Sequence, residues 1–324
     1  VTQALARVKR EEAEAIQINE TPGAPYFIGS REEYNRIINL RGQSTYYLEK
    51  ARRGTVTDYA RIYWLKVKAY SPESNRAKIF TLSNKELPRA QEIPPTYGAW
   101  IEAELLHPLM RGRDVGRYCW STQGWYQLIP NNHYAIIESE QNFATQYPLA
   151  YHYLCKYKAQ LLKRSSYNRY QKESPFYSIF CIGDYSFAKY KVVWPELQNP
   201  NQFRAAAVTT NVGFLSNKVV VPDHKLYYVS LDSEDEAYYL SAILNSGPVR
   251  QLLGGVLLSK NIGVSVFKFL NVPPYDDSNN YHRLIAQIGN EASTKRSGLL
   301  KKGLLPAEKE KELEDLVFCA FSQR

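Results

Sequence analysis

The chain has 324 residues, and its hydrophobic fraction of 44% is enough for a packed core and too high for wholesale disorder. No apolar run approaches the roughly 20 residues of a membrane helix, no signal-peptide pattern is visible at the start, and we expect a cytoplasmic protein. The net charge of +9 and a pI near 9.1 favour a polyanionic partner such as nucleic acid, and the 26 tyrosines suit surfaces that combine a flat ring with a hydroxyl.

The beginning of the chain has the pattern of a connector. Residues 2–15 mix charged and helix-forming residues and predict a helix, which Gly23 and Pro25 end. Because the sequence opens with Val1 and not Met, we expect an internal fragment of a longer protein, with the missing part upstream. The predicted divisions are a connector helix over 1–22, a main domain over 23–277 and a helical segment over 278–324.

From residue 26 to 138 the pattern is mostly that of strands. Short aromatic and β-branched runs alternate with turn residues such as Pro94-Pro95. We expect strands at 62–67, 78–82 and 134–137, and a helix over 32–40.

A single long helix is predicted from about Pro148 to Tyr170. Apolar side chains recur there at four-residue spacing, at Leu149, Tyr153, Tyr157 and Leu161. Its second half and the residues after it carry cations with no acidic residue before Glu173: Lys156, Lys158, Lys163, Arg164, Arg169 and Lys172. Since salt-bridged surface helices mix both signs, a run of one sign indicates a binding face.

Strands return in the next part of the chain, and helices end it. The predicted strands are 176–182, 190–194, 205–209, 217–221 and 226–230. Acidic residues over 232–236 indicate the start of a helix over 235–245, and two more helices follow near 278–297 and 306–321. The predicted fold class is α+β, with mixed or antiparallel sheets, a long basic helix and a helical C-terminal tail.

The patterns of catalytic sites are missing from the sequence. Leu253-Gly254-Gly255-Val256 lacks the glycine spacing of a nucleotide site. In Val272-Pro273-Pro274-Tyr275 a valine stands where an amino-methyltransferase needs a polar residue to accept from the target amine, so we interpret this segment as a loop. The cysteines form no Cys-x-x-Cys pair and the histidines no ligand spacing, which predicts free thiols and no metal site. We expect no catalysis and no cofactor in this chain.

Four segments together resemble one family. They are Tyr47–Gly54, Leu105–Tyr118, Pro175–Trp194 and Val219–Ser246. In this order they look like the C-terminal specificity region of adenine-N6 DNA methyltransferases, a region also found in type IIG restriction–modification enzymes and related phage-defence methylases. The resemblance runs from about residue 45 to 285.

The resemblance implies that residues 23–277 are a target-recognition domain, which clamps duplex DNA against a catalytic domain. The methylase half, with its S-adenosylmethionine site and Asn-Pro-Pro-Tyr motif, would precede Val1. The parent would be a site-specific adenine-N6 DNA methyltransferase, with or without an endonuclease, and this chain would not methylate alone.

The candidate DNA-contacting side chains are basic residues and the tyrosines among them: Arg52, Arg53, Arg111, Arg113, Arg117, Lys163, Arg164, Tyr167, Arg169, Tyr170, Lys172, Lys189 and Lys191. Arginine forks bind a guanine edge or a phosphate, and Gly112 and Gly116 would allow a close approach. The alternative for this loop is that Asp114 holds one arginine in a salt bridge and the loop locks the fold. The alternative for 163–172 is a solvated helix end whose cations favour the helix dipole.

Two other functions stay open at this point. In a protein-interaction or scaffold module the basic faces would dock an acidic catalytic subunit, with no independent DNA binding. An RNA-binding domain would use the tyrosines for stacking, but no RNA-module signature is present. Basic residues gathered on one face favour DNA, whereas dispersed charge favours the scaffold.

Overall fold

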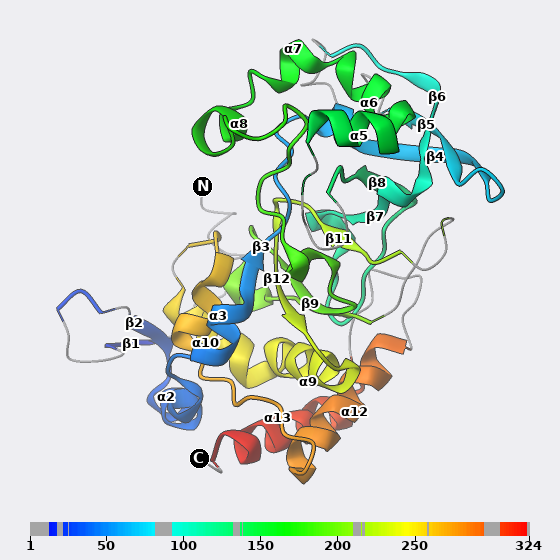
Figure 1. Ribbon diagram of the computed structural model, residues 1–324. Helices are drawn as coiled ribbons and strands as arrows, with labels where there is room; N and C mark the ends of the chain where they lie inside the picture. Colours follow the sequence, from blue (N-terminus) through cyan, green and yellow to red (C-terminus); the bar gives the residue numbers. More distant parts are fainter. Residues whose placement is uncertain are drawn as a thin grey trace, which may run out of the picture.

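The chain folds into two lobes, each built on its own β-sheet (Figure 1). The computed structural model describes residues 13–17, 22–24, 26–81, 93–131, 137, 139–209, 215, 218–257, 259–294 and 305–322. None of the helices within these ranges is both long enough and apolar enough to span a bilayer.

The upper lobe contains a six-stranded sheet of order β11-β7-β8-β4-β5-β6. The strands are β4 (Trp64–Ser71), β5 (Arg76–Thr81), β6 (Tyr97–Glu102), β7 (Leu106–Met110), β8 (Trp125–Leu128) and β11 (Val221–Pro222). All neighbours are antiparallel except β11 and β7. Inward side chains such as Leu65, Ile79 and Ile101 form a core with Phe143 of α5 (Glu140–Gln146) and Leu154 of α6 (Pro148–Cys155).

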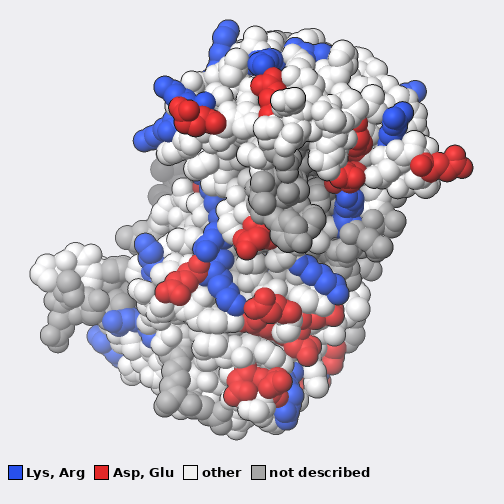
Figure 2. Space-filling view, in the orientation of Figure 1, with Lys and Arg blue, Asp and Glu red and all other residues white. Residues whose placement is uncertain are grey.

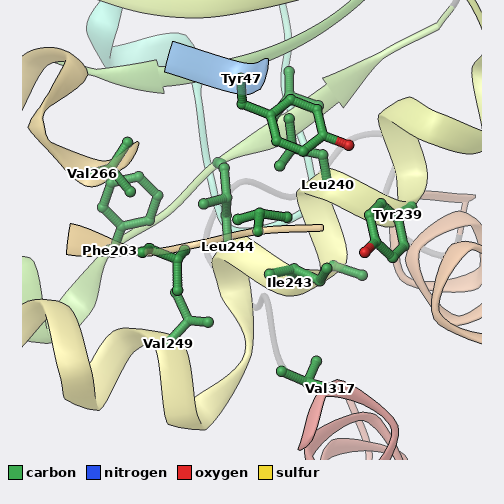
Figure 3. Close-up of a cluster of buried hydrophobic side chains, with 14 of the residues drawn as sticks. Tyr47, Phe203, Tyr239, Leu240, Ile243, Leu244, Val249, Val266 and Val317 are labelled. Carbon is green, nitrogen blue, oxygen red and sulfur yellow. The ribbon is translucent and has the colours of Figure 1, made fainter. Parts of the chain in front are cut away.

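The lower lobe contains an antiparallel four-stranded sheet of order β10-β9-β12-β3. Its strands are β3 (Ala51–Arg53), β9 (Tyr190–Pro195), β10 (Ala206–Val208) and β12 (Leu226–Leu231). Helices cover one face of this sheet: α9 (Glu234–Asn245), α10 (Gly247–Val256), α12 (Asn280–Thr294) and α13 (Ala307–Ser322). Figure 3 shows side chains of α9 pointing into this core beside Tyr47, Phe203 and Val249.

Both ends of the chain join the lower core. The β1 (Glu14–Gln17) and β2 (Tyr26–Gly29) hairpin contributes Ile16 and Phe27, and α13 contributes Val317 and Phe321. Between hairpin and sheet lie α2 (Arg31–Ile37), which the Ser30 and Glu33 side chains cap, and α3 (Thr45–Lys50). The remaining short elements used below are α4 (Ala60–Tyr63), α7 (Lys158–Leu161), α8 (Ser165–Tyr170), η4 (Gly112–Asp114) and η5 (Asp184–Phe187).

The predicted α+β class with a helical C-terminal region is confirmed. The helices expected near 235–245, 278–297 and 306–321 are α9, α12 and α13, and the strands at 190–194, 205–209 and 226–230 are β9, β10 and β12. Helix α10 was not predicted, because its glycines are poor helix formers. Most of the strand expected at 134–137 lies outside the described residues.

The long basic helix is a wrong prediction, because residues 148–170 form the three short helices α6, α7 and α8. The backbone leaves the helical region at Tyr157 and again at Arg164, where ψ is 137°. At the second break the Arg164 side chain turns inward and donates to the carbonyl oxygens of Ser178 (2.7 Å) and Phe176 (2.6 Å). The inward hydrogen bonds of Arg164 therefore accompany the break between α7 and α8.

Three further local predictions are wrong. The expected helix over 2–15 is wrong at its end, because strand β1 begins at Glu14, and its residues 2–12 lie outside the described residues. Residues 60–63 form helix α4, so the strand expected at 62–67 begins at Trp64. The strand expected at 176–182 is reduced to one bridge between Phe180 and Val56, because Cys181 has a φ of 56°, outside the strand region.

Candidate nucleic-acid interface

The edge strand β3 presents two arginines where the two lobes meet. In a strand, successive side chains point to opposite faces. Arg52 therefore lies over the Tyr185 ring (5.3 Å to the centroid) on one face. Arg53 on the other face donates from Nε to the His224 carbonyl (2.9 Å) and pairs with Glu196 (3.3 Å). Both side chains are part-exposed, so the edge of the sheet is lined by cations.

Gly54 fixes the path of the chain immediately after these arginines. A β-carbon at this position would overlap the carbonyl oxygen of Asp223, because the two backbones are in close contact. Thr55 continues the contact by donating from its backbone N to the Pro222 carbonyl (3.0 Å). The segment 222–225 is thereby held beside β3, which brings Lys225 to the same edge, where it pairs with Glu196 (3.4 Å).

A shallow pocket of about 330 Å³ opens beside the β3 edge. Lys50, Arg52, Tyr185 and Ala188 line it, together with the exposed acidic residues Asp184 and Asp232. Lys189, the residue after Ala188, is exposed and lies over the Tyr190 ring (4.9 Å). Cations from two separate parts of the sequence therefore lie at this pocket or next to it.

Residues 163–172 divide into an inner and an outer set. Arg164 and Tyr167 are buried, and the Tyr167 hydroxyl donates to the Ser174 carbonyl (2.9 Å). The outer set is exposed and consists of Lys163, Arg169, Tyr170 and Lys172. Tyr170 is 57% exposed and stacks on Phe180, with 4.6 Å between the ring centroids. The Arg169 guanidinium lies over the Tyr170 ring, 5.4 Å from its centroid. This outer set can offer charge and one flat ring to a ligand.

The helix α8, which lies at the centre of the outer set and carries Arg169 and Tyr170, is tied to the continuation of β3. The Asp58 carboxylate accepts from the backbone N (2.9 Å) and the hydroxyl (2.7 Å) of Ser166. Phe180, on which Tyr170 stacks, pairs its backbone with Val56. Figure 2 shows Lys and Arg side chains at the upper left, over the region of α7 and α8, and again in a vertical run between the two lobes on the same face.

The Arg-Gly-Arg-Asp loop has one arginine inside and one outside. Arg111 is buried, pairs with the fully buried Asp114 (3.1 Å), and lies over Trp125 (5.2 Å). The alternative that Asp114 holds one arginine and the loop locks the fold is therefore what the structure has at Arg111. Arg113 is exposed, and Gly112 beside it packs against Lys225, so Arg113 joins the cations near the β3 edge.

Two other predicted contact residues are used inside the protein. Arg117 donates to the Asn245 carbonyl (2.8 Å) and pairs with Glu310 (2.8 Å), which ties α13 to α9. Lys191 is buried and donates to the Ala188 carbonyl, and burial lowers its pKa to about 7. The predictions that Arg111, Arg117, Arg164, Tyr167 and Lys191 contact DNA are therefore wrong for this conformation, because internal partners hold these side chains.

We call the remaining group the junction surface. It consists of Lys50, Arg52, Arg53, Arg113, Lys163, Arg169, Tyr170, Lys172, Lys189 and Lys225. Burial, followed by the charges of Lys225 and Arg53, lowers the pKa of His224 beneath it, so this imidazole is neutral at pH 7. A surface of several cations with a stacked aromatic ring is suited to a polyanion.

Lys50 and Lys225 were missed as site residues, although each lies in a segment that carries the family resemblance. Lys50 follows one turn after Tyr46 and lies over its ring (4.3 Å), and Lys225 ends the Pro222–Lys225 block. The sequence could have indicated them, because Lys50 is two residues before Arg52 and Lys225 is two residues after Asp223. Their common location depends on strand pairing, which the sequence does not display.

Comparisons with known proteins give similarities to methyltransferases and restriction–modification enzymes. No protein-family model matches the chain. The type II methyltransferase M.NspV of Nostoc sp. is 28% identical over 157 residues, which are 48% of this chain and 31% of that enzyme. The chain is thus homologous, over about half its length, to part of a type II methyltransferase.

One solved structure is similar to the chain at the level of the fold. The type IIL restriction–modification enzyme MmeI, solved in complex with DNA, matches 98% of this chain and 39% of its own, with a TM-score of 0.52 and 14% identity. The type IIG restriction endonuclease BpuSI covers 91% of this chain and 33% of its own at a TM-score of 0.34 and 16% identity. The chain therefore spans roughly a third of the length of each of these relatives.

Proposed function

We propose that this chain is the specificity module of an adenine-N6 DNA methyltransferase or restriction–modification enzyme, and that it binds duplex DNA at the junction surface. The observation that carries the proposal is that exposed and part-exposed cations of β3, the η4 loop and the 222–225 turn lie near one sheet edge, while those of residues 163–172 surround α8, which Asp58 ties to the continuation of β3. The homology to a type II methyltransferase supports the class of the parent enzyme.

Within the junction surface, we assign some side chains to phosphate contacts and others to base contacts from their chemistry. Arg169 of α8, Lys163 just before this helix and Lys172 just after it have no ion-pair partner among the described residues, and they suit phosphate contacts that set affinity and register. Arg52 and Arg113, on an edge strand and a tight turn, suit the bidentate reading of a guanine edge. The exposed Tyr170 ring can pack against a sugar or a thymine methyl group.

The chemical step belongs to another part of the parent protein in this proposal. A methylase domain upstream of Val1 would bind S-adenosylmethionine and transfer the methyl group, and the present chain would position the target duplex in front of it. A nuclease domain could accompany the methylase without changing the role of the junction surface.

Selection from a random duplex library tests the proposal. The chain should enrich one short motif, and its affinity should fall steeply with salt, because each phosphate contact releases counterions. The variant Arg169→Gln/Lys172→Gln should lower affinity and reduce the slope of log K against log salt by about 2, one for each phosphate contact. The matched control Arg283→Gln/Lys311→Gln removes two exposed cations from α12 and α13 and should change neither.

Two results would overturn the proposal. One is no enriched motif and no measurable duplex binding at low salt, which would favour the scaffold module. The other is an equal loss of affinity in the control variant, since that would mean attraction by net charge without a defined surface.

A further inference from the structure

Among the described residues, no helix or strand covers one face of the six-stranded sheet at its β4-β5-β6 end, where Tyr97 and Trp100 are exposed. Strand pairing sets which side chains share this face: Lys66 lies opposite Phe80, Phe80 opposite Tyr97, and Lys78 opposite Trp100. The residues between them, such as Leu65, Ile79 and Ile101, point to the other face and into the core with α5 and α6. We call the first set the open sheet face: Lys66, Arg76, Lys78, Phe80, Tyr97 and Trp100.

We propose that the open sheet face binds unpaired DNA by stacking bases on Tyr97 and Trp100. This goes beyond duplex recognition at the junction surface and does not depend on it, because the open sheet face has its own cations and its own aromatic rings.

A β-bulge places the two rings on the same face. In a regular strand, residues 97 and 100 would point to opposite faces, because they are an odd number of positions apart. The pairing shifts by one residue between Ile79 and Phe80, which leaves Gly98 as the extra residue with a φ of 75°. Bulges commonly re-aim side chains, and here the bulge puts Tyr97 and Trp100 side by side on the exposed surface.

The rings are presented to solvent and flanked by cations. Tyr97 is 65% exposed and Trp100 is 41% exposed, although apolar rings of this size are usually covered. The Lys78 side chain lies across Gly98 between them, since a β-carbon at Gly98 would stand 3.1 Å from Lys78 Cε. Phe80 packs edge-on against Tyr97 at 6.5 Å and supports that ring from beneath.

The charge of this face favours a polyanion over a protein partner. Lys66, Arg76 and Lys78 project from neighbouring strands. Glu102 lies opposite Arg76 in the same rows at the end of β6, and its carboxylate is engaged by the backbone N of Leu149 and Ala150 at the start of α6. Among the described residues, no other acidic side chain lies in the rows of this face.

Unpaired DNA fits this geometry better than duplex DNA. In a duplex each base is already covered by its neighbours, so a ring lying flat on a sheet has no exposed base to stack on. Single strands offer a free face on every base, and sheets with aromatic rings and flanking cations bind them with little sequence preference.

Fluorescence anisotropy with a labelled oligo(dT) of about 12 nucleotides tests the proposal on the full chain, a length within the usual site size of such surfaces. The variants Trp100→Leu and Tyr97→Leu keep an apolar residue on the edge strand, and each should weaken oligo(dT) binding by roughly 5- to 100-fold, the range for one lost stacking contact. The control Tyr26→Leu removes a ring that is 46% exposed on β2 and should leave binding unchanged. Circular dichroism of each variant checks that the fold is kept.

A duplex of the same length, measured in parallel, separates this proposal from the proposed function. Arg169→Gln/Lys172→Gln should weaken duplex binding and leave oligo(dT) binding intact, while the open-face variants should do the reverse. Oligo(dT) binding without duplex binding would support this inference and remove the proposed function. Absence of oligo(dT) binding by the folded chain at low salt, or equal binding by Trp100→Leu, would overturn the inference, as would a parallel loss of duplex binding in the open-face variants.

Discussion

The neighbouring residues Lys163 and Arg164 have the same charge and opposite expected behaviour on substitution. Lys163 is exposed on the junction surface, whereas Arg164 is 1% exposed and lies within the upper lobe. Substituting each by methionine removes one positive charge and keeps an unbranched side chain. The pair therefore separates the effect of charge from the effect of buried hydrogen bonds.

The cost of Arg164→Met can be worked out from the partners that it leaves behind. The guanidinium donates to the carbonyls of Leu161 (3.0 Å), Ser178 (2.7 Å) and Phe176 (2.6 Å). The Leu161 carbonyl keeps the Arg164 backbone N as a donor, but the carbonyls of Ser178 and Phe176 lose the guanidinium as their donor. An unsatisfied buried carbonyl costs about 1–3 kcal/mol, so the variant should lose about 3–5 kcal/mol of unfolding free energy.

Urea denaturation followed by circular dichroism measures this loss. Against a typical stability of about 5–15 kcal/mol, the midpoint for Arg164→Met should fall markedly with little change in slope. Lys163→Met should stay within about 0.5 kcal/mol of the parent, as surface substitutions do, and should reduce the salt slope of duplex binding by about 1. Equal stability of the two variants would refute the assignment of Arg164 to the interior.

Further predictions concern the close backbone contact at Gly54 and two buried ionisable groups. Gly54→Ala should destabilise by about 1–3 kcal/mol in thermal unfolding, because its β-carbon meets the Asp223 carbonyl. Burial lowers the pKa of Lys191 to about 7, so the unfolded chain binds the extra proton between pH 7 and 10; stability should rise across pH 7–9, and Lys191→Met should flatten that rise. Burial raises the pKa of Asp223 to about 7, so the folded chain holds the extra proton; stability should fall from pH 4 to 7, and Asp223→Asn should remove that fall. Denaturation curves at fixed ionic strength across these pH ranges check both signs, and a flat profile in the parent chain would contradict them.

Elements whose signals are local could be predicted from the sequence. The start of α9 carries a serine whose hydroxyl accepts from the Glu236 backbone N, followed by acidic residues that favour a helix N-terminus. Strands β9 and β12 are apolar runs bounded by turn residues, and they pair with each other over Leu226–Leu231. In each case the residues that decide the structure lie within the element.

Features decided by distant partners could not be predicted in this way. The four-residue spacing of apolar side chains continues from Leu149 to Leu161, yet the helix breaks, because Arg164 finds its acceptors in residues 176–178. The sequence indicates Asp114 as a partner for one arginine of its loop, but it does not show that this arginine is Arg111 or that Gln123 also contacts it. The exposed candidate residues stay a prediction, whereas the candidates held inside the protein could not be recognised from the sequence.

In the proposed function, the cations of residues 163–172 bear on how a specificity module could change its target. Arg111, Arg117 and Lys191 belong to segments that carry the family resemblance, and each is held by internal partners. Lys163, Arg169 and Lys172 lie between those segments, in and around the short helix α8, which Arg164 and Asp58 attach to the rest of the protein. Enzymes that share a frame but read different sequences need fixed internal cations and replaceable outer ones. The segment 163–172 meets that requirement, because its inner side chains hold the position while its outer side chains can be exchanged without disturbing the core.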